Sequence, residues 1–230
     1  MEKRNLGRDR VAAVGLGAMS FAGVYGATTE EVSHATLAAM LDLGMDHVDT
    51  SNIYGMGVSE EVIGRFLARQ GKARSKLFHI ATKAAIRVDR DANRRWFDNS
   101  AEHLTSELEG SLKRLGLESV DLFYVHRRDR TIPIEEVTGT LAGLVAAGKA
   151  RAFGFSEIAP TTLYRAAREH PVASEYSDCT AATGCTAAAR RSEAGAISEK
   201  PIERVLPAFT RRASDSVTSS IGRLWSRRCT

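Results

Sequence analysis

The chain has 230 residues, of which 43% are hydrophobic and 26% are charged, and this composition is ordinary for a globular protein. Its length fits one large domain, or one domain with a tail. No apolar run approaches the roughly 18–20 residues that cross a bilayer, and the charged start MEKRNLGRDR lacks the apolar stretch of a signal peptide. We therefore expect a cytoplasmic protein that has no membrane partner.

The formal net charge of +4 comes from the C-terminal part of the chain. Of 32 basic and 28 acidic residues, nine basic and five acidic ones lie in residues 177–230, which leaves 23 of each sign before them. A neutral body gives no reason to expect nucleic acid as a partner. All three cysteines also lie in residues 177–230, with spacings unlike those of a zinc site or a disulfide framework, so we predict no metal site.

Short apolar segments typical of buried strands recur along the first 176 residues. The first is Val11–Gly17, whose lone GxG we interpret as a tight turn, because a dinucleotide-binding loop needs a third glycine. The sequence predicts further strands at Met45–Thr50, Leu77–Lys83, Val120–His126, Ala150–Ser156 and Val172–Tyr176.

Amphipathic segments between these strands predict helices. The first helix is expected to open at Thr28, whose spacing to Glu31 is that of a capping box, and to stop at Gly44. A charged loop is expected between Lys83 and Ser100. Further helices are expected from about Ser59, from about Ser100 to Leu115, from Pro133 to Gly148, and from about Pro160 to His170.

Strict alternation of strands and helices indicates a parallel sheet with crossover helices, either an open doubly wound sheet or a (β/α)8 barrel. An open sheet usually carries GxGxxG after its first strand, and this chain does not. A barrel places function at the carboxyl ends of several strands, where Asp49, Lys83 and His126 end three consecutive predicted strands. We therefore predict an α/β fold of the (β/α)8 TIM-barrel type, truncated after its sixth strand.

Four side chains near these strand ends form a set suited to proton transfer. A tyrosine, here Tyr54, is normally protonated at neutral pH, and a nearby ammonium such as that of Lys83 favours its phenolate. A carboxylate such as Asp49 keeps the ammonium charged, and an imidazole such as His126 can donate a hydrogen bond to a carbonyl oxygen. Such a site polarises a carbonyl group for reduction by an external hydride.

Each of these residues also has a simpler interpretation when it is taken alone. Asp49 could cap a turn, Tyr54 could pack its ring in a loop, and Lys83 could be a solvated charge. His126 precedes the charged residues 127–130 and could belong to a polar loop. Their coincidence at successive strand ends favours a shared site.

The segments DTSNIYG, ATK and DLFYVH, with GLGAMSFAGVYG before them and GFSE and SEYS after them, resemble the aldo-keto reductase family. The resemblance is closest to bacterial members related to the potassium-channel β subunits, and it covers roughly residues 1–177. It implies a (β/α)8 barrel that binds NADPH without a Rossmann fold and reduces an aldehyde or ketone. It also implies a catalytic tetrad in which Tyr54 is the general acid, Lys83 and Asp49 tune its pKa, and His126 orients the substrate.

Two positions depart from the pattern of this family, which commonly holds the nicotinamide carboxamide with Ser-Asn after the fifth strand and Gln on the sixth. Ser156 matches the serine, Glu157 replaces the asparagine, and Ala173 stands where the glutamine would be. The resemblance thus implies Ser156, Glu157 and Asp49 as cofactor-binding residues. The loss of two polar contacts is expected to weaken cofactor binding by on the order of 1–3 kcal/mol.

The sequence changes character at Ser177. We predict a reductase-like barrel portion over residues 1–177 and a tail of low order over residues 178–230, which is rich in Ala, Ser, Thr and Arg and lacks the strand–helix alternation. Our hypothesis is that the tail is an out-of-frame translation of the missing quarter of the barrel, and the alternative is a natural, divergent C-terminus. The nucleotide sequence beyond codon 177, read in the neighbouring frame, distinguishes the two.

Three functions follow from these observations. The first is NADPH-dependent reduction of a small carbonyl substrate, which the intact tetrad favours. The second is a non-catalytic module that binds the cofactor, and the third is an inactive, truncated reductase. The sequence leaves the carbonyl substrate and the oligomeric state open.

Overall fold

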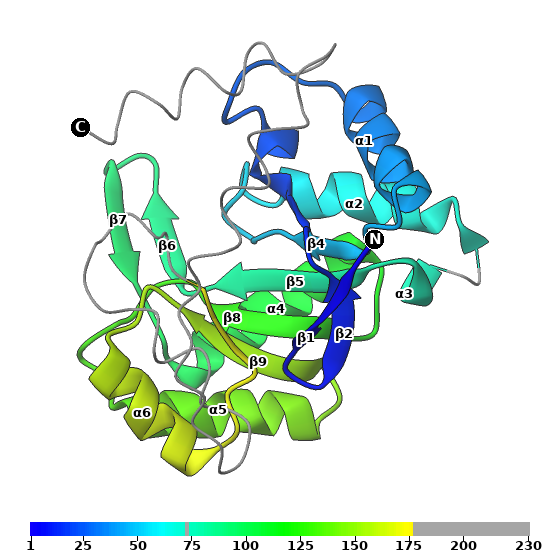
Figure 1. Ribbon diagram of the computed structural model, residues 1–230. Coiled ribbons are helices and arrows are strands. Elements are labelled where there is room, and N and C mark those ends of the chain that lie inside the picture. The colour runs from blue at the N-terminus through cyan, green and yellow to red at the C-terminus, as the bar shows by residue number, and fades with distance from the viewer. Residues whose placement is uncertain (72–73, 177–230) are drawn as a thin grey trace, which may run out of the picture. The chain divides into compact units, whose positions relative to one another are not determined.

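The computed structural model describes residues 1–71 and 74–176 (Figure 1). Their central feature is a six-stranded sheet in the order β10-β9-β8-β5-β4-β3, in which every pair of neighbours is parallel. The strands are β3 (Leu16–Gly17), β4 (His47–Asp49), β5 (His79–Ala84), β8 (Val120–Val125), β9 (Ala150–Ser156) and β10 (Ser174–Tyr176). Predictions for residues 177–230 concern residues outside the described part.

The helices follow the strands around the sheet in chain order. Neighbouring helices in contact are α1 with α2, α2 with α4, α4 with α5, and α5 with α6. Their bounds are α1 (Glu30–Asp42), α2 (Val58–Ala68), α4 (Ala101–Leu115), α5 (Ile134–Ala146) and α6 (Pro160–Glu169), with the short α3 (Arg74–Leu77) before β5 and the 3-10 helix η1 (Ala18–Ala22) after β3. A doubly wound sheet reverses its strand order at one point, whereas this order runs in one direction. The predicted TIM-barrel class is therefore confirmed.

Alternate residues of the strands face two different surroundings. Side chains such as Val48, Ile80 and Phe123 join the large cluster that the helices cover. Ala81, Leu122 and Tyr124 form a second, smaller cluster on the inner side of the sheet. Because successive side chains of a strand point to opposite faces, this alternation lets one strand build both the core and the barrel interior.

Two hairpins stand at opposite ends of the strands (Figure 1). The hairpin of β1 (Lys3–Leu6) and β2 (Asp9–Ala12) lies at the amino ends, where Leu6 packs against the inner cluster. The hairpin of β6 (Ile86–Asp89) and β7 (Arg94–Phe97) follows β5 and lies at the carboxyl ends.

Three details of the sequence-based expectations are wrong. The expected strand Val11–Gly17 is divided between β2 and β3, because Gly15 passes so close to His47 that a Cβ there would lie 2.7 Å from the His47 ring. The N-cap of α1 is Thr29, whose hydroxyl accepts a hydrogen bond from the Val32 amide at 3.3 Å, and not Thr28. The expected charged loop after Lys83 forms the β6–β7 hairpin instead.

The contact of α2 with α4 depends on one glycine and one buried ion pair. A Cβ on Gly64 would lie 2.1 Å from the Arg114 carbonyl oxygen, so the two helices approach each other more closely than any side chain permits. Glu60, fully buried on α2, accepts a hydrogen bond from Arg114 at 2.6 Å and another from Thr82 of β5. These bonds tie β5 to both helices.

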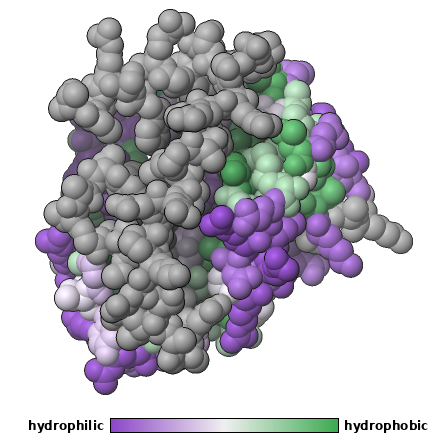
Figure 2. Space-filling view, in the orientation of Figure 1, coloured by the Kyte–Doolittle hydropathy of each residue, from purple (hydrophilic) through white to green (hydrophobic). Residues whose placement is uncertain are grey.

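Helix α1 is apolar on two sides. Leu37 and Met40 are buried in the core, while Val32 on the helix and Leu43 directly after it are exposed. Figure 2 shows hydrophobic residues gathered over α1, with hydrophilic residues along their border. Among the described residues, every helix is too short or too polar to span a lipid bilayer.

Candidate active site

The site is built around Lys83, which lies on β5 and is 1% exposed. Its neighbour Thr82 points outward to Glu60, so the alternation of the strand turns Lys83 inward. The ammonium group forms an ion pair with Asp49, the last residue of β4, and donates a hydrogen bond to the Thr50 carbonyl oxygen at 2.9 Å. Asp49 pairs with Ala81 on β5, two residues before Lys83, so Asp49 and Lys83 point to the same face of the sheet.

Tyr54 lies in the turn between β4 and α2, where hydrogen bonds at both ends hold it. Its amide donates to the Ser51 carbonyl oxygen at 3.1 Å, and its own carbonyl oxygen accepts from the Ser59 amide at 3.2 Å. The Lys83 ammonium lies 5.3 Å from the centroid of the Tyr54 ring. This distance is within the range of a favourable cation–π contact.

His126 follows β8 directly and extends its ladder, since its amide donates to the Ala84 carbonyl oxygen at 2.7 Å. The ring is 9% exposed and stands edge-on to the Tyr54 ring, with 5.9 Å between their centroids. The structure thus brings Asp49, Tyr54, Lys83 and His126 together at the carboxyl ends of the strands.

Burial and nearby cations keep His126 neutral. Loss of hydration, together with the positive charges of Lys83, Arg127 and Arg95, lowers the pKa of His126 from 6.5 to about 3. Burial raises the pKa of Asp49, and the Lys83 ammonium opposes this shift. The imidazole therefore remains uncharged throughout the neutral range, with a proton on one of its two nitrogens.

Ser51 contacts His126 and was not predicted as a site residue. Its Oγ lies 3.1 Å from His126 Nδ1 and 3.1 Å from the Lys83 carbonyl oxygen. Asn52 gives its amide hydrogen to Glu107 at 2.7 Å and turns its oxygen toward Ser51. Two arrangements of protons fit these distances. When the Ser51 hydroxyl donates to Nδ1, the imidazole proton is on Nε2. When the hydroxyl instead donates to an oxygen, the proton is on Nδ1, which then donates to Ser51 Oγ.

Ser156 and Glu157 follow one another at the end of β9. Ser156 is 2% exposed, and its Oγ accepts a hydrogen bond from the Arg127 guanidinium at 3.3 Å. Glu157 has a left-handed backbone with φ 53° and lines a pocket of about 400 Å³. Ala173 lies near the other end of the barrel, where a Cβ on Gly7 would be 2.9 Å from its methyl group.

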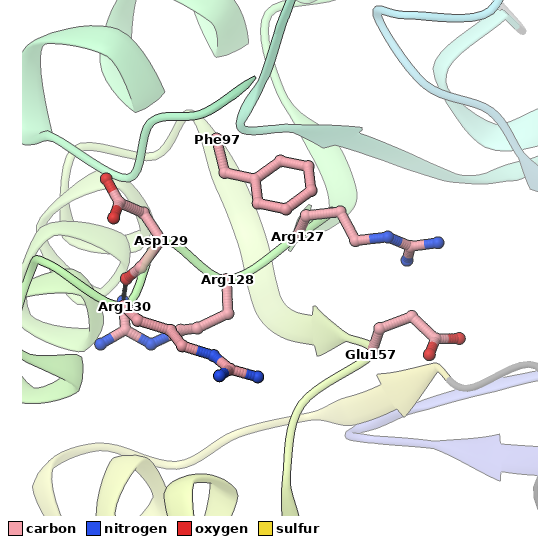
Figure 3. A pocket seen from close by; sticks show the side chains of 6 residues that line it. All are labelled: Phe97, Arg127, Arg128, Asp129, Arg130 and Glu157. Carbon is pink, nitrogen blue, oxygen red and sulfur yellow. Dashed lines mark hydrogen bonds between the residues drawn. The ribbon is translucent and has the colours of Figure 1, made fainter. Parts of the chain in front are cut away.

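The pocket beside Glu157 combines three separate segments of the chain (Figure 3). Phe97 comes from the end of β7, and Arg127, Arg128, Asp129 and Arg130 come from the loop after β8. From the sequence, the charged residues after His126 fit a polar loop, and no local pattern predicts a pocket there. The run of arginines directly after a candidate site residue was the one signal for it.

Residues 13–191 match the aldo/keto reductase family. Among curated relatives, the aldo-keto reductase yakc [NADP(+)] of Schizosaccharomyces pombe is 39% identical over 177 residues, which are 76% of this chain and 52% of the relative. The aldo-keto reductase YhdN of Bacillus subtilis is 38% identical over 144 residues, which are 62% of this chain and 42% of YhdN. The chain thus spans about half the length of the curated relatives it matches.

Two solved structures also resemble this chain over about half of their own length. The glycerol dehydrogenase AKR11B4 of Gluconobacter oxydans matches with a TM-score of 0.67 and 30% identity over 76% of this chain and 54% of its own. The aldo-keto reductase AKR11C1 of Bacillus halodurans, in its holo form, matches with a TM-score of 0.68 and 27% identity over 77% of this chain and 57% of its own. This chain belongs to the aldo/keto reductase family.

Proposed function

We propose that this chain reduces an aldehyde or ketone to an alcohol with NADPH. The observation that carries the proposal is the cluster of four groups at one end of the barrel. The Lys83 ammonium pairs with Asp49 and lies 5.3 Å from the Tyr54 ring, which itself lies 5.9 Å from the His126 ring. A phenol, an ammonium and a neutral imidazole around one point are suited to polarising and protonating a carbonyl oxygen.

The proton is supplied by Tyr54 in this proposal. Its hydroxyl donates to the substrate oxygen as charge develops there, and the Lys83 ammonium stabilises the phenolate that remains. Asp49 holds the ammonium in place through their ion pair. His126 acts as a neutral donor from Nε2, which requires the Ser51 hydroxyl to donate to Nδ1.

NADPH, when bound, supplies the hydride. The preference for NADPH is supported by the name of the Schizosaccharomyces pombe relative, which includes NADP(+). The residues at the end of β9 fit a carboxamide: Arg127 donates to Ser156 and leaves the serine hydrogen free to donate, while Glu157 can accept from an amide. We propose Ser156, Glu157 and Asp49 as its contacts.

The test combines turnover with binding. Loss of NADPH absorbance is followed with an aromatic aldehyde, and the quenching of protein fluorescence by NADPH is titrated in parallel. Turnover supports the reductase. Binding without turnover supports the alternative of a non-catalytic cofactor-binding module, and the absence of both supports an inactive protein.

A further inference from the structure

The pocket of about 400 Å³ directly adjoins the candidate active site. Two of its lining residues, Arg127 and Glu157, follow His126 and Ser156 in the chain. Arg127 also donates a hydrogen bond to the His126 carbonyl oxygen at 3.1 Å. A molecule whose carbonyl group reaches Tyr54 and His126 therefore has the pocket as the neighbouring space for the rest of its body.

The three arginines of the pocket have different surroundings. Arg128 is used within its own loop, where it donates to the carbonyl oxygens of Asp129 and Ile132 and, at 3.3 Å, to Asn99. Arg127 is half-buried and held by His126 and Ser156. Arg130 is exposed. Arg128 thus stabilises the conformation of the loop, while the guanidinium groups of Arg127 and Arg130 can donate hydrogen bonds to a ligand in the pocket.

The positive charges on the pocket wall outnumber the negative ones. Three guanidinium groups line it together with two carboxylates. One of these, Asp129, accepts hydrogen bonds from the amide and the hydroxyl of Thr131 at 2.9 and 2.7 Å. Figure 3 shows its carboxylate pointing away from Arg127. Glu157 is the remaining acid on the wall.

We propose that this pocket binds an anionic oxygen group, a carboxylate or a phosphate ester, of the carbonyl substrate. The proposal rests on the proposed reductase function and names its substrate class: small aldehydes or ketones that carry a negative charge away from the carbonyl carbon. Guanidinium groups match the planar geometry of carboxylate and phosphate oxygens. Phe97, 40% exposed beside the arginines, offers an apolar surface for the carbon body of such a molecule.

The first experiment compares two aldehydes that differ by one charge, 4-carboxybenzaldehyde and its methyl ester. We expect kcat/KM for the acid to exceed that for the ester by about tenfold or more, because a charge-assisted hydrogen bond is added. In Arg130→Gln this preference falls about tenfold, mainly through KM. The control Arg8→Gln removes an equally exposed charge at the opposite end of the barrel and keeps the preference. Equal values for both aldehydes, or a preference that Arg130→Gln leaves intact, overturns the proposal.

A second experiment needs no turnover. Binding of benzoate, phenyl phosphate and neutral benzamide is measured by calorimetry on the full chain. We expect the anions to bind more tightly than benzamide, to lose affinity with added salt, and to lose about tenfold in Arg130→Gln. The stronger of the two anions identifies the group as carboxylate or phosphate.

The two experiments separate the failure of either proposal. If anions bind in an Arg130-dependent manner while no aldehyde consumes NADPH, the reductase function fails and the anion site remains. If the methyl ester is reduced as well as the acid and no anion binds, the reductase function stands and the anion site is refuted.

Discussion

Ionisable groups gather at both ends of the parallel sheet, partly buried at the amino ends and largely buried at the carboxyl ends. At the amino ends, the Nδ1 atoms of His47 and His79 lie 3.0 Å apart, and Asp9 lies 3.6 Å from His79. Arg151 joins Asp9 at 3.0 Å and Asp121 at 3.2 Å. At the carboxyl ends, Lys83 and Asp49 form the ion pair beside Tyr54 and His126.

Access distinguishes the two ends. The β1–β2 hairpin lies over the amino ends, where Leu6 packs against the inner cluster and Gly7 touches Ala173. The carboxyl ends adjoin the arginine-lined pocket. Similar groups thus serve to hold a hairpin in place at one end, whereas at the other they surround a space that a small molecule can enter. The four predictions below test this contrast.

The largest effect is expected from Tyr54→Phe. Removal of the hydroxyl takes away the proposed general acid and leaves the ring that packs against His126. We expect kcat to fall by about 10²- to 10⁴-fold, with little change in the free energy of unfolding. Activity equal to that of the unchanged protein in the NADPH assay would refute the assignment of Tyr54.

The next effect concerns the buried ion pair. Lys83→Met leaves the Asp49 side chain, which is 14% exposed, without its cation, and we expect the free energy of unfolding to fall by about 3–5 kcal/mol. The double variant Lys83→Met/Asp49→Asn removes both charges and should recover most of this loss. Urea unfolding of the single and double variants measures the difference. A double variant as unstable as the single one would contradict the pairing.

The two ends should respond alike to acid, since the carboxyl ends hold the buried His126 and the amino ends the partly buried His47, both with a lowered pKa. The pKa is about 3 for His126 and about 4 for His47, where burial and the charges of His79 and Lys83 act together. Below pH 6.5 these histidines bind protons in the unfolded chain but not in the folded chain. The free energy of unfolding therefore falls as the pH falls, until the pH reaches the pKa of each histidine in the folded chain. We expect a loss of about 1.4 kcal/mol per pH unit for each histidine.

Denaturant unfolding at pH 7, 6 and 5 measures this slope. His47→Gln removes one of the histidine contributions and should reduce the slope without changing the pH profile of kcat. A slope that His47→Gln leaves unchanged would show that His47 does not titrate as described.

The smallest effect is expected from Arg151→Ala at the amino ends. Arg151 pairs with Asp9 and Asp121, but its side chain is 61% exposed, and such pairs contribute about 1 kcal/mol or less. We expect a small loss of stability and unchanged kcat/KM. A large loss of activity would mean that the amino ends take part in the reaction and that the contrast between the two ends is false.

The sequence predicted the elements well wherever local periodicity decides them. The strands around Asp49, Lys83, His126 and Ser156 are present, and the helix expected from about Ser100 to Leu115 runs over Ala101–Leu115. The sequence-based expectations are wrong where contacts between residues far apart in the chain determine the local structure. The approach of Gly15 to His47 divides the first strand, and the pairing of β6 with β7 orders a segment that local composition indicated as a loop.

The sequence by itself determined the barrel class, the family resemblance and the four residues at the strand ends, because strand ends and alternation are properties of neighbouring residues. The roles of these residues and of Ser156 and Glu157 stay predictions. Tertiary structure alone decided that Ser51 contacts His126, and that Phe97 of β7 and the arginines after β8 line one pocket. These distances depend on how strands far apart in the chain pair and curve, and no local pattern encodes them.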